Sequence, residues 1–233
     1  MKKATILCCV AMVSMSFVVS LSDCDTLIFF KEGVKTTITS YNDDGKAIGT
    51  TKTIYKKVDK NGSTLSANAT QENYDKKGKL SVTTDFTIKC LNGTLLFDMK
   101  LMLPQQQAES FKDFEIVVEG ADKEIPNDLT AGGTLKDADI KFSFKTKDGT
   151  TMPMMNMSVK ITNRKVEGKE SITTAAGTFE CYKITEEVEM KTMFKIRAKV
   201  SSWFSKEVGI VKTESYKENG KFTGKTELTE IIK

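Results

Sequence analysis

The sequence predicts an all-β protein, in which one large antiparallel sheet of about 10–12 strands curls into an open or half barrel, or a sandwich, with one short helix. Turn residues recur at short intervals, and between them apolar and polar residues alternate with a period of two. No linker or change of composition divides residues 23–233. We therefore expect a single β-rich domain over that range.

The N-terminus has the pattern of a secretory signal peptide. Lys2 and Lys3 precede an apolar run of about 16 residues, and the small residues Ser20 and Ser22 follow it. The run is shorter than the roughly 20 residues that cross a bilayer. We expect residues 1–22 to be a cleaved signal peptide and the protein to be exported to the periplasm or cell envelope.

Hairpin turns are expected wherever Asn or Asp precedes Gly. Both Asn and Asp tolerate left-handed backbone conformations, and Gly adopts positive φ freely. The turns are predicted at Asn42–Gly45, Asp59–Gly62, Asp75–Gly78, Asn92–Gly93, Asp148–Gly149 and Asn219–Gly220.

The strands are expected between these turns, each with one buried face. Apolar residues recur at every second position in five segments, which alternate with Lys, Ser, Thr and Asp in the manner of antiparallel strands. The apolar stripes are residues 80–90, 95–103, 140–144, 155–161 and 194–200, the last comprising Phe194, Ile196, Ala198 and Val200. The short helix is predicted at residues 104–114, where Pro104 suits the first turn.

The chain contains no histidine, which excludes Ser-His-Asp and Cys-His catalysis and His-ligated zinc. Its 35 Lys and Arg and 31 Asp and Glu are interspersed, so the sequence predicts no basic patch for nucleic acid or anionic lipid. We expect no nucleic-acid partner, cofactor or catalytic residue. A carboxylate- or metal-based enzyme, such as a hydrolase, remains the enzymatic alternative.

Three cysteines follow the predicted signal peptide, and three pairings are open to them. We favour a Cys24–Cys90 disulfide, because it would attach the N-terminal segment to the sheet and leave Cys181 as a buried thiol. The alternatives are no disulfide, or a lipid on Cys24. The second alternative requires a lipoprotein box in which Asp23 replaces the usual small residue.

Methionines supply candidate residues for an apolar ligand. Met155 and Met157 continue into the apolar stripe at 155–161, and Met99 lies in the stripe at 95–103. Because methionine packs irregular space, we interpret Met99, Met155 and Met157 as a wall for the core or for an apolar ligand. Cu(I) binding by the four methionines within residues 152–157 is the alternative.

Three further residues are assigned structural roles. Gly177 interrupts the strand pattern of residues 171–190, which predicts a hinge between two strands. The buried side changes between Cys181 and Tyr182, which indicates a bulge or a strand buried on both faces. Cys181 has no histidine base and is expected to be structural rather than nucleophilic. Trp203 is expected to pack against the sheet.

Three runs resemble the exported proteins of Bacteroidota called TapB-like, which are related to an exported domain family of unknown function. The resemblance covers most of residues 23–233 and implies a β-rich envelope protein with no assigned activity and no catalytic residues. The runs are Asn163-Arg164-x-Val166, Ala176-Gly177-Thr178-Phe179-x-Cys181-Tyr182-Lys183, and Trp203 with Val208-Gly209-x-Val211-Lys212-x-Glu214.

These observations favour a non-enzymatic binding or structural role in the envelope, with an apolar ligand held by the sheet. The alternative is a module that docks on an envelope protein complex, which would expose an apolar patch or edge.

Overall fold

The computed structural model describes residues 23–102, 114–150, 152 and 156–233. These residues form one antiparallel sheet of 13 strands in the order β6-β8-β9-β10-β11-β12-β13-β1-β2-β3-β4-β5-β7. The strands are β1 (Lys35–Asn42), β2 (Ala47–Asn61), β3 (Thr64–Asp75), β4 (Leu80–Leu91), β5 (Thr94–Phe97), β6 (Glu115–Gly120), β7 (Lys123–Pro126), β8 (Ala138–Lys145), β9 (Met157–Thr174), β10 (Gly177–Lys191), β11 (Lys195–Ser205), β12 (Gly209–Lys217) and β13 (Phe222–Ile232).

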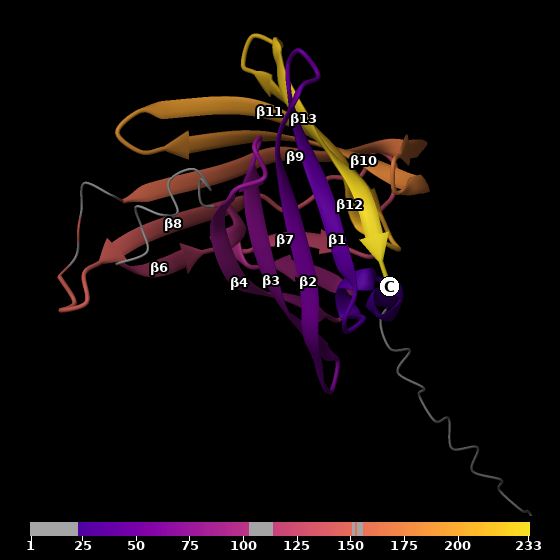
Figure 1. Ribbon diagram of the computed structural model, residues 1–233, viewed down its shortest axis with the longest axis horizontal. Helices are drawn as coiled ribbons and strands as arrows, with labels where there is room; N and C mark the ends of the chain where they lie inside the picture. Colours follow the sequence, from indigo (N-terminus) through magenta and orange to yellow (C-terminus); the bar gives the residue numbers. More distant parts are fainter. Residues whose placement is uncertain (1–22, 103–113, 151, 153–155) are drawn as a thin grey trace, which may run out of the picture.

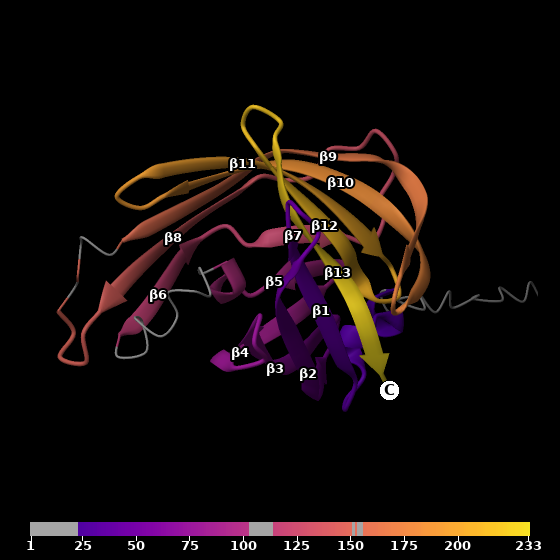
Figure 2. The ribbon, with the colours of Figure 1, turned by 45° about the horizontal axis from the view of Figure 1, so that its top comes forward.

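The sheet curls into a half barrel, which confirms the predicted fold class. Figures 1 and 2 show β8–β11 arching over β1–β5. The two edge strands, β6 and β7, are consecutive along the chain and are separated only by Ala121 and Asp122. Register shifts in several strand pairs, for example between Tyr55 and Lys57 of β2, supply the bulges that bend the strands.

Helical structure is limited to three 3₁₀ turns within the described ranges: η1 (Asp23–Thr26), η2 (Ile28–Phe30) and η3 (Met99–Met102). The helix predicted at 104–114 and the predicted signal peptide lie outside the described residues, apart from Phe114. The region 120–138 contains β7 and a bridge between Thr134 and Lys165.

The interior is divided into two apolar clusters. The larger one, here called the main core, lies between η1–η2, β2–β5, β7 and parts of β9–β13. The smaller one, the arm core, lies where β8 and the first half of β9 extend away from the rest of the sheet (Figure 1). Its buried members are Met99, Ala138, Ile140, Phe142, Phe144, Met157, Val159 and Ile161.

The N-terminal segment helps to cover the main core. The Ile28 amide donates to the Glu207 carbonyl at 2.9 Å, and the Phe29 ring lies 5.4 Å from the Tyr55 ring between centroids. Gly209 approaches Phe29 so closely that a Cβ atom there would lie 2.0 Å from Cζ, and its φ is +79°. A side chain at this position is therefore excluded twice, by space and by backbone conformation.

The prediction of a buried apolar stripe at residues 194–200 was wrong for its first two members, Phe194 and Ile196. Phe194 is 75% exposed and Ile196 is 59% exposed. The last β11–β12 pair joins Ala198 to Lys217, so β11 extends past the end of its neighbour and has no β12 strand beside it at Ile196. The alternation of residue types is present, but the fold places no core beneath it.

Candidate functional site

An apolar pocket of about 220 Å³ lies beside the N-terminal segment. Leu27, Leu95, Ile125 and Phe204 form its apolar surface, and each of these four side chains is at most 5% exposed. They come from the segment that joins η1 to η2 and from β5, β7 and β11, so the curl of the sheet brings together residues that are far apart in sequence. Thr26, Gly93, Pro126, Asn127 and Lys206 complete the lining, together with Cys24.

Lys206 supplies the positive charge of this pocket. Its side chain is exposed, and its ammonium nitrogen lies 5.7 Å from the centroid of the Tyr182 ring. The cation and the apolar lining together suit a ligand that has an apolar body and an anionic end. Three other hollows are lined mainly by polar and charged side chains.

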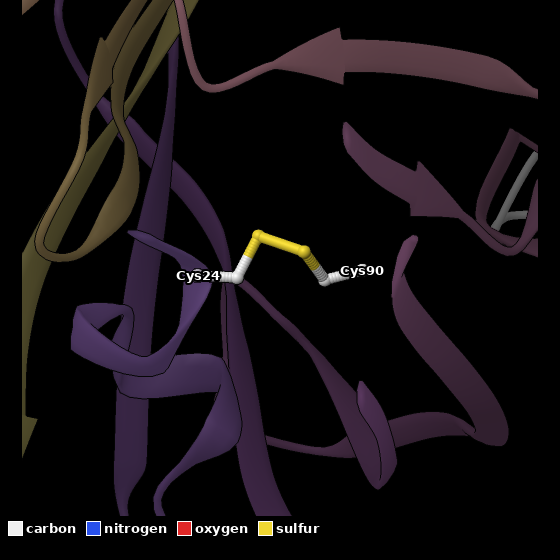
Figure 3. Close-up of a disulfide and its surroundings, with 2 residues drawn as sticks. All are labelled: Cys24 and Cys90. Carbon is white, nitrogen blue, oxygen red and sulfur yellow. A yellow bond between two sulfur atoms is a disulfide. The ribbon is translucent and has the colours of Figure 1, made fainter. Parts of the chain in front are cut away.

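A disulfide between Cys24 and Cys90 anchors this pocket (Figure 3). It connects η1 to β4 across a sequence separation of 66 residues, with 6.4 Å between the two Cα atoms. Both cysteines are buried. Of the pairings that the sequence leaves open, this is the one that the structure forms, and it leaves Cys181 as a buried free thiol.

Gly177 is the first residue of β10, directly after the turn from β9, and Cys181 lies farther along β10. Gly177 pairs with Thr174 across the turn and has a φ of +138°, a conformation that side chains rarely adopt. The thiol of Cys181 donates to the Phe179 carbonyl at 3.5 Å. Burial raises the pKa of Cys181 to about 11, with a further contribution from Glu180 and Glu170.

Trp203 lies in β11 and is 5% exposed. Its indole N–H donates to the Glu170 carboxylate at 2.7 Å. The ammonium groups of Lys183 and Lys212, from the neighbouring strands β10 and β12, lie 5.2 and 4.6 Å from its ring. Cation–π contacts and the stems of long polar side chains therefore surround this indole.

Met99 and Met157 are both buried in the arm core, whereas Met155 lies outside the described residues. Neither Met99 nor Met157 lines the apolar pocket. The part of the chain that the structure describes contains no group of three His, Cys, Asp or Glu residues that could hold a metal ion.

Sequence reasoning missed a buried ionic cluster in β9 and β10. Up to Ile161 the odd-numbered residues of β9 face inward, but from Arg164 to Val166 the even-numbered residues do. Asn163, with a φ of +53°, produces this change, because the strand register shifts at that point. The bulge therefore turns the Arg164 side chain into the interior, between the arm core and the main core.

Each of the three guanidinium nitrogens of Arg164 has a polar partner in this position. Its side chain is 0% exposed, and its Nε lies 3.4 Å from the Glu186 carboxylate, which also accepts from Lys123 at 2.5 Å. The two terminal nitrogens donate to backbone carbonyls, Nη1 to Lys136 and Nη2 to Glu124 at 2.9 Å. Because Glu124 belongs to the edge strand β7, the guanidinium connects that edge to β9 across the interior.

The three runs that carry the family resemblance contribute to the ionic cluster around Arg164 and to the surroundings of Trp203. The first run contains the bulge residue Asn163 and the buried Arg164, and the other two supply Trp203 with the lysines that cover it. The signature thus describes packing and ionic contacts. The Asn-Arg pair was a usable signal for the cluster, since Asn tolerates the left-handed conformation of such a bulge.

A family model described as DUF3108-like matches residues 31–228, which include all the strands except the last residues of β13. The chain belongs to the DUF3108-like family. This match confirms the family relationship that the resemblance implied. No curated protein matches the sequence significantly.

Two solved structures are similar in fold to this DUF3108-like chain. A candidate exported protein with a YmcC-like fold from Bacteroides fragilis has a TM-score of 0.72 at 20% identity, over 87% of this chain and 97% of the other. A candidate lipoprotein from Parabacteroides distasonis has a TM-score of 0.72 at 23% identity, over 89% of this chain and all of the other. At these identities the likeness shows the fold alone.

Proposed function

We propose that the protein is a non-enzymatic binding protein of the cell envelope, which holds an apolar group with an anionic end in the pocket beside the disulfide. The observation that carries this proposal is the pairing of a buried apolar lining with Lys206, the single cation among the described lining residues. The pocket is smaller than the roughly 300–1,000 Å³ of typical ligand sites. It therefore suits a narrow group, such as the end of an acyl chain.

The envelope location is supported by the signal-peptide pattern and by the descriptions of the two structural relatives as an exported protein and a lipoprotein. The Cys24–Cys90 bond argues against lipidation of this chain at Cys24, because a sulfur in a disulfide cannot also carry a thioether-linked lipid. Intact-mass measurement of the exported protein tests both points: it should show loss of about 22 residues and no added diacylglycerol.

The ligand can be sought directly. The protein is purified from the producing cell without denaturation, and native mass spectrometry is used to find a bound small molecule with an acidic group. Release of such a molecule on unfolding, at one per chain, is the expected result. A stoichiometric ligand without acidic or apolar character would contradict the proposal.

A fluorescent probe tests the assignment to this pocket. Cis-parinaric acid, a fluorescent fatty acid, combines a narrow apolar chain with a carboxylate, and a non-fluorescent fatty acid that occupies the pocket should displace it. Lys206→Gln should weaken probe binding several-fold, and Thr26→Phe should reduce it further by filling the space. Lys76→Gln, at an exposed lysine in the β3–β4 turn and away from the pocket lining, is the matched control. Unchanged binding by both pocket variants would place the probe elsewhere.

A further inference from the structure

The β10–β11 hairpin ends in an exposed apolar turn. We define the hairpin tip as residues 190–196. Met193 is 76% exposed, Phe194 is 75% exposed and Ile196 is 59% exposed, which makes them the three most exposed large apolar side chains of the described chain. Isolated exposed apolar residues are ordinary, but three within four positions at the end of a hairpin form a contiguous apolar surface.

The turn itself is well defined. Lys191 pairs with Lys195 as the last residues of the two strands, and the Thr192 amide donates to the Phe194 carbonyl at 3.0 Å. The Phe194 amide in turn donates to the Thr192 hydroxyl at 3.4 Å. These bonds hold Met193 and Phe194 in the turn between β10 and β11, which Figures 1 and 2 show at the same end of the sheet as the turn after β8.

The tip itself carries positive charge. Residues 190–196 contain Lys191 and Lys195 and no acid, and the turn after β8 adds Lys147 beside Asp148. Lys141 and Lys145 of β8 lie opposite Glu119 and Glu115 of β6, so they are not counted here. The nearest acid behind the tip, Glu189, is already paired with Lys195 and Arg197. Lys191 has no carboxylate partner among the described residues. Lys147 comes from a separate hairpin, and the fold places it at the same end of the sheet as Lys191.

We propose that the hairpin tip inserts into the surface of an anionic phospholipid bilayer. Apolar side chains that enter the headgroup boundary, flanked by lysines that meet lipid phosphates, are the combination by which peripheral proteins bind such membranes. Three side chains do not provide the roughly 800 Å² that each partner buries in a stable protein interface. A bilayer requires no such complementary area, and its negative charge matches the lysines.

This proposal is independent of the ligand pocket. The pocket is lined by η1, β5, β7 and the far end of β11, and no lining residue belongs to the hairpin tip. A change at the tip should leave probe binding in the pocket unaltered, so the two proposals can fail separately.

Vesicle flotation of the chain without its predicted signal peptide tests the membrane contact. Vesicles of phosphatidylglycerol and phosphatidylethanolamine are compared with vesicles of phosphatidylcholine alone. We expect binding to the anionic vesicles that weakens as salt is raised. Lys191→Gln should lower the partition constant about fivefold, which corresponds to one lysine near an anionic surface. The double variant Met193→Ser/Phe194→Ser should lower it at least about tenfold.

Leu80→Ser is the matched control, since Leu80 is 45% exposed beside the β3–β4 hairpin turn and follows Lys79. It should bind vesicles as the unmodified protein does. A second measurement places a polarity-sensitive fluorophore at the tip through Phe194→Cys, because the remaining thiol, Cys181, is buried. A blue shift on addition of anionic vesicles is expected.

Three results would overturn the proposal. The first is absence of binding to anionic vesicles. The second is equal binding by the double variant and the unmodified protein. The third is a concentration-dependent dimer that the double variant abolishes while vesicle binding persists, since this would assign the tip to a second copy of the chain.

Discussion

The main core and the arm core belong to the same sheet, yet they are covered in different ways. The main core is enclosed by the N-terminal segment, which the Cys24–Cys90 disulfide fixes to β4. The arm core is covered by Met99 of η3 and by partly buried side chains, including Ile116 and Val118 of β6. Beside it, β10 and β11 end in a tip that no described residue covers. A strand pattern thus yields a buried face only as far as neighbouring elements extend.

The two cores meet at a charged cluster rather than at a continuous apolar layer. Arg164 and Glu186 lie between Ile161 of the arm core and Val166 of the main core on one side, and between Val188 and Ile184 on the other. A buried ion pair is costly to assemble, because two charges lose their hydration. It also fixes geometry, since the guanidinium bonds to two backbone carbonyls from separate segments.

Loss of the Arg164 side chain should therefore have the largest effect on stability. Arg164→Met leaves the Glu186 carboxylate buried with one partner and leaves the Glu124 and Lys136 carbonyls without theirs. We expect a loss of about 3–5 kcal/mol in the free energy of unfolding, measured by urea denaturation. Arg197→Met, which removes a half-exposed cation paired with Glu189, is the control and should cost about 1 kcal/mol or less.

The double variant Arg164→Met/Glu186→Leu separates the two causes of this loss. It also removes the buried Glu186 carboxylate, which Arg164→Met leaves with Lys123 as its one charged partner, so it should recover part of the stability that Arg164→Met loses. If Arg164→Met were no more costly than Arg197→Met, the cluster would not be the connection between the two cores.

Removal of the disulfide tests how firmly the N-terminal segment covers the main core. Cys24→Ala/Cys90→Ala should cost up to about 4 kcal/mol, the chain-entropy value for a loop closed over a separation of 66 residues. Hydrogen exchange should also become faster at η2 and at the Tyr55 amide, which bonds to the Val34 carbonyl. Amides of β8 and of the first half of β9, which belong to the arm core, should be unaffected. Equal acceleration in both regions would mean that the two cores open together.

Substitution of Trp203 tests how much its packing between β10 and β12 contributes to the stability of the main core. Its indole is surrounded by Glu170, Lys183 and Lys212, and Trp203→Ala should cost about 3 kcal/mol. As the single tryptophan, it should emit at short wavelength and be protected from iodide. Phe194→Ala, at the uncovered tip, should change stability by no more than about 0.5 kcal/mol. Emission like that of free tryptophan would contradict the burial of Trp203.

The sequence predicted the class of fold because hairpin turns and alternation are local properties. Asn163 shows where this reasoning stops. One left-handed residue reverses the inward side of β9, so Arg164 reads as a solvent residue by alternation and lies in the interior in fact. The exposure of Phe194 also depends on a neighbouring element. Because the pairing of β12 with β11 ends at Ala198, the residue pattern of β11 alone could not reveal that Phe194 is exposed. Pocket residues such as Leu27, Ile125 and Phe204 could not be grouped, because only the curl of the sheet makes them neighbours.

We expect the smallest effect at Cys181. The rate at which its thiol is alkylated distinguishes a packed thiol from a nucleophilic one. Burial raises the pKa of this thiol to about 11, and the thiolate is the nucleophilic form. The folded protein should therefore react slowly with iodoacetamide at pH 8 and rapidly once unfolded in urea. Rapid alkylation of the folded protein at that pH would restore a nucleophilic role for this residue.

The same pKa sets a direction for stability against pH. Because the folded-state pKa of Cys181 lies above its usual value of 9.0, the neutral thiol is favoured in the folded state. Its contribution to stability is fully present below pH 9 and is lost as pH rises toward 11. Tyrosines and lysines titrate in the same range, so the measurement is the difference in unfolding free energy between the unmodified protein and Cys181→Ala at each pH. That difference should be largest at pH 8 and should shrink between pH 9 and 11, whereas a constant difference would mean that the thiol titrates alike in the folded and unfolded chain.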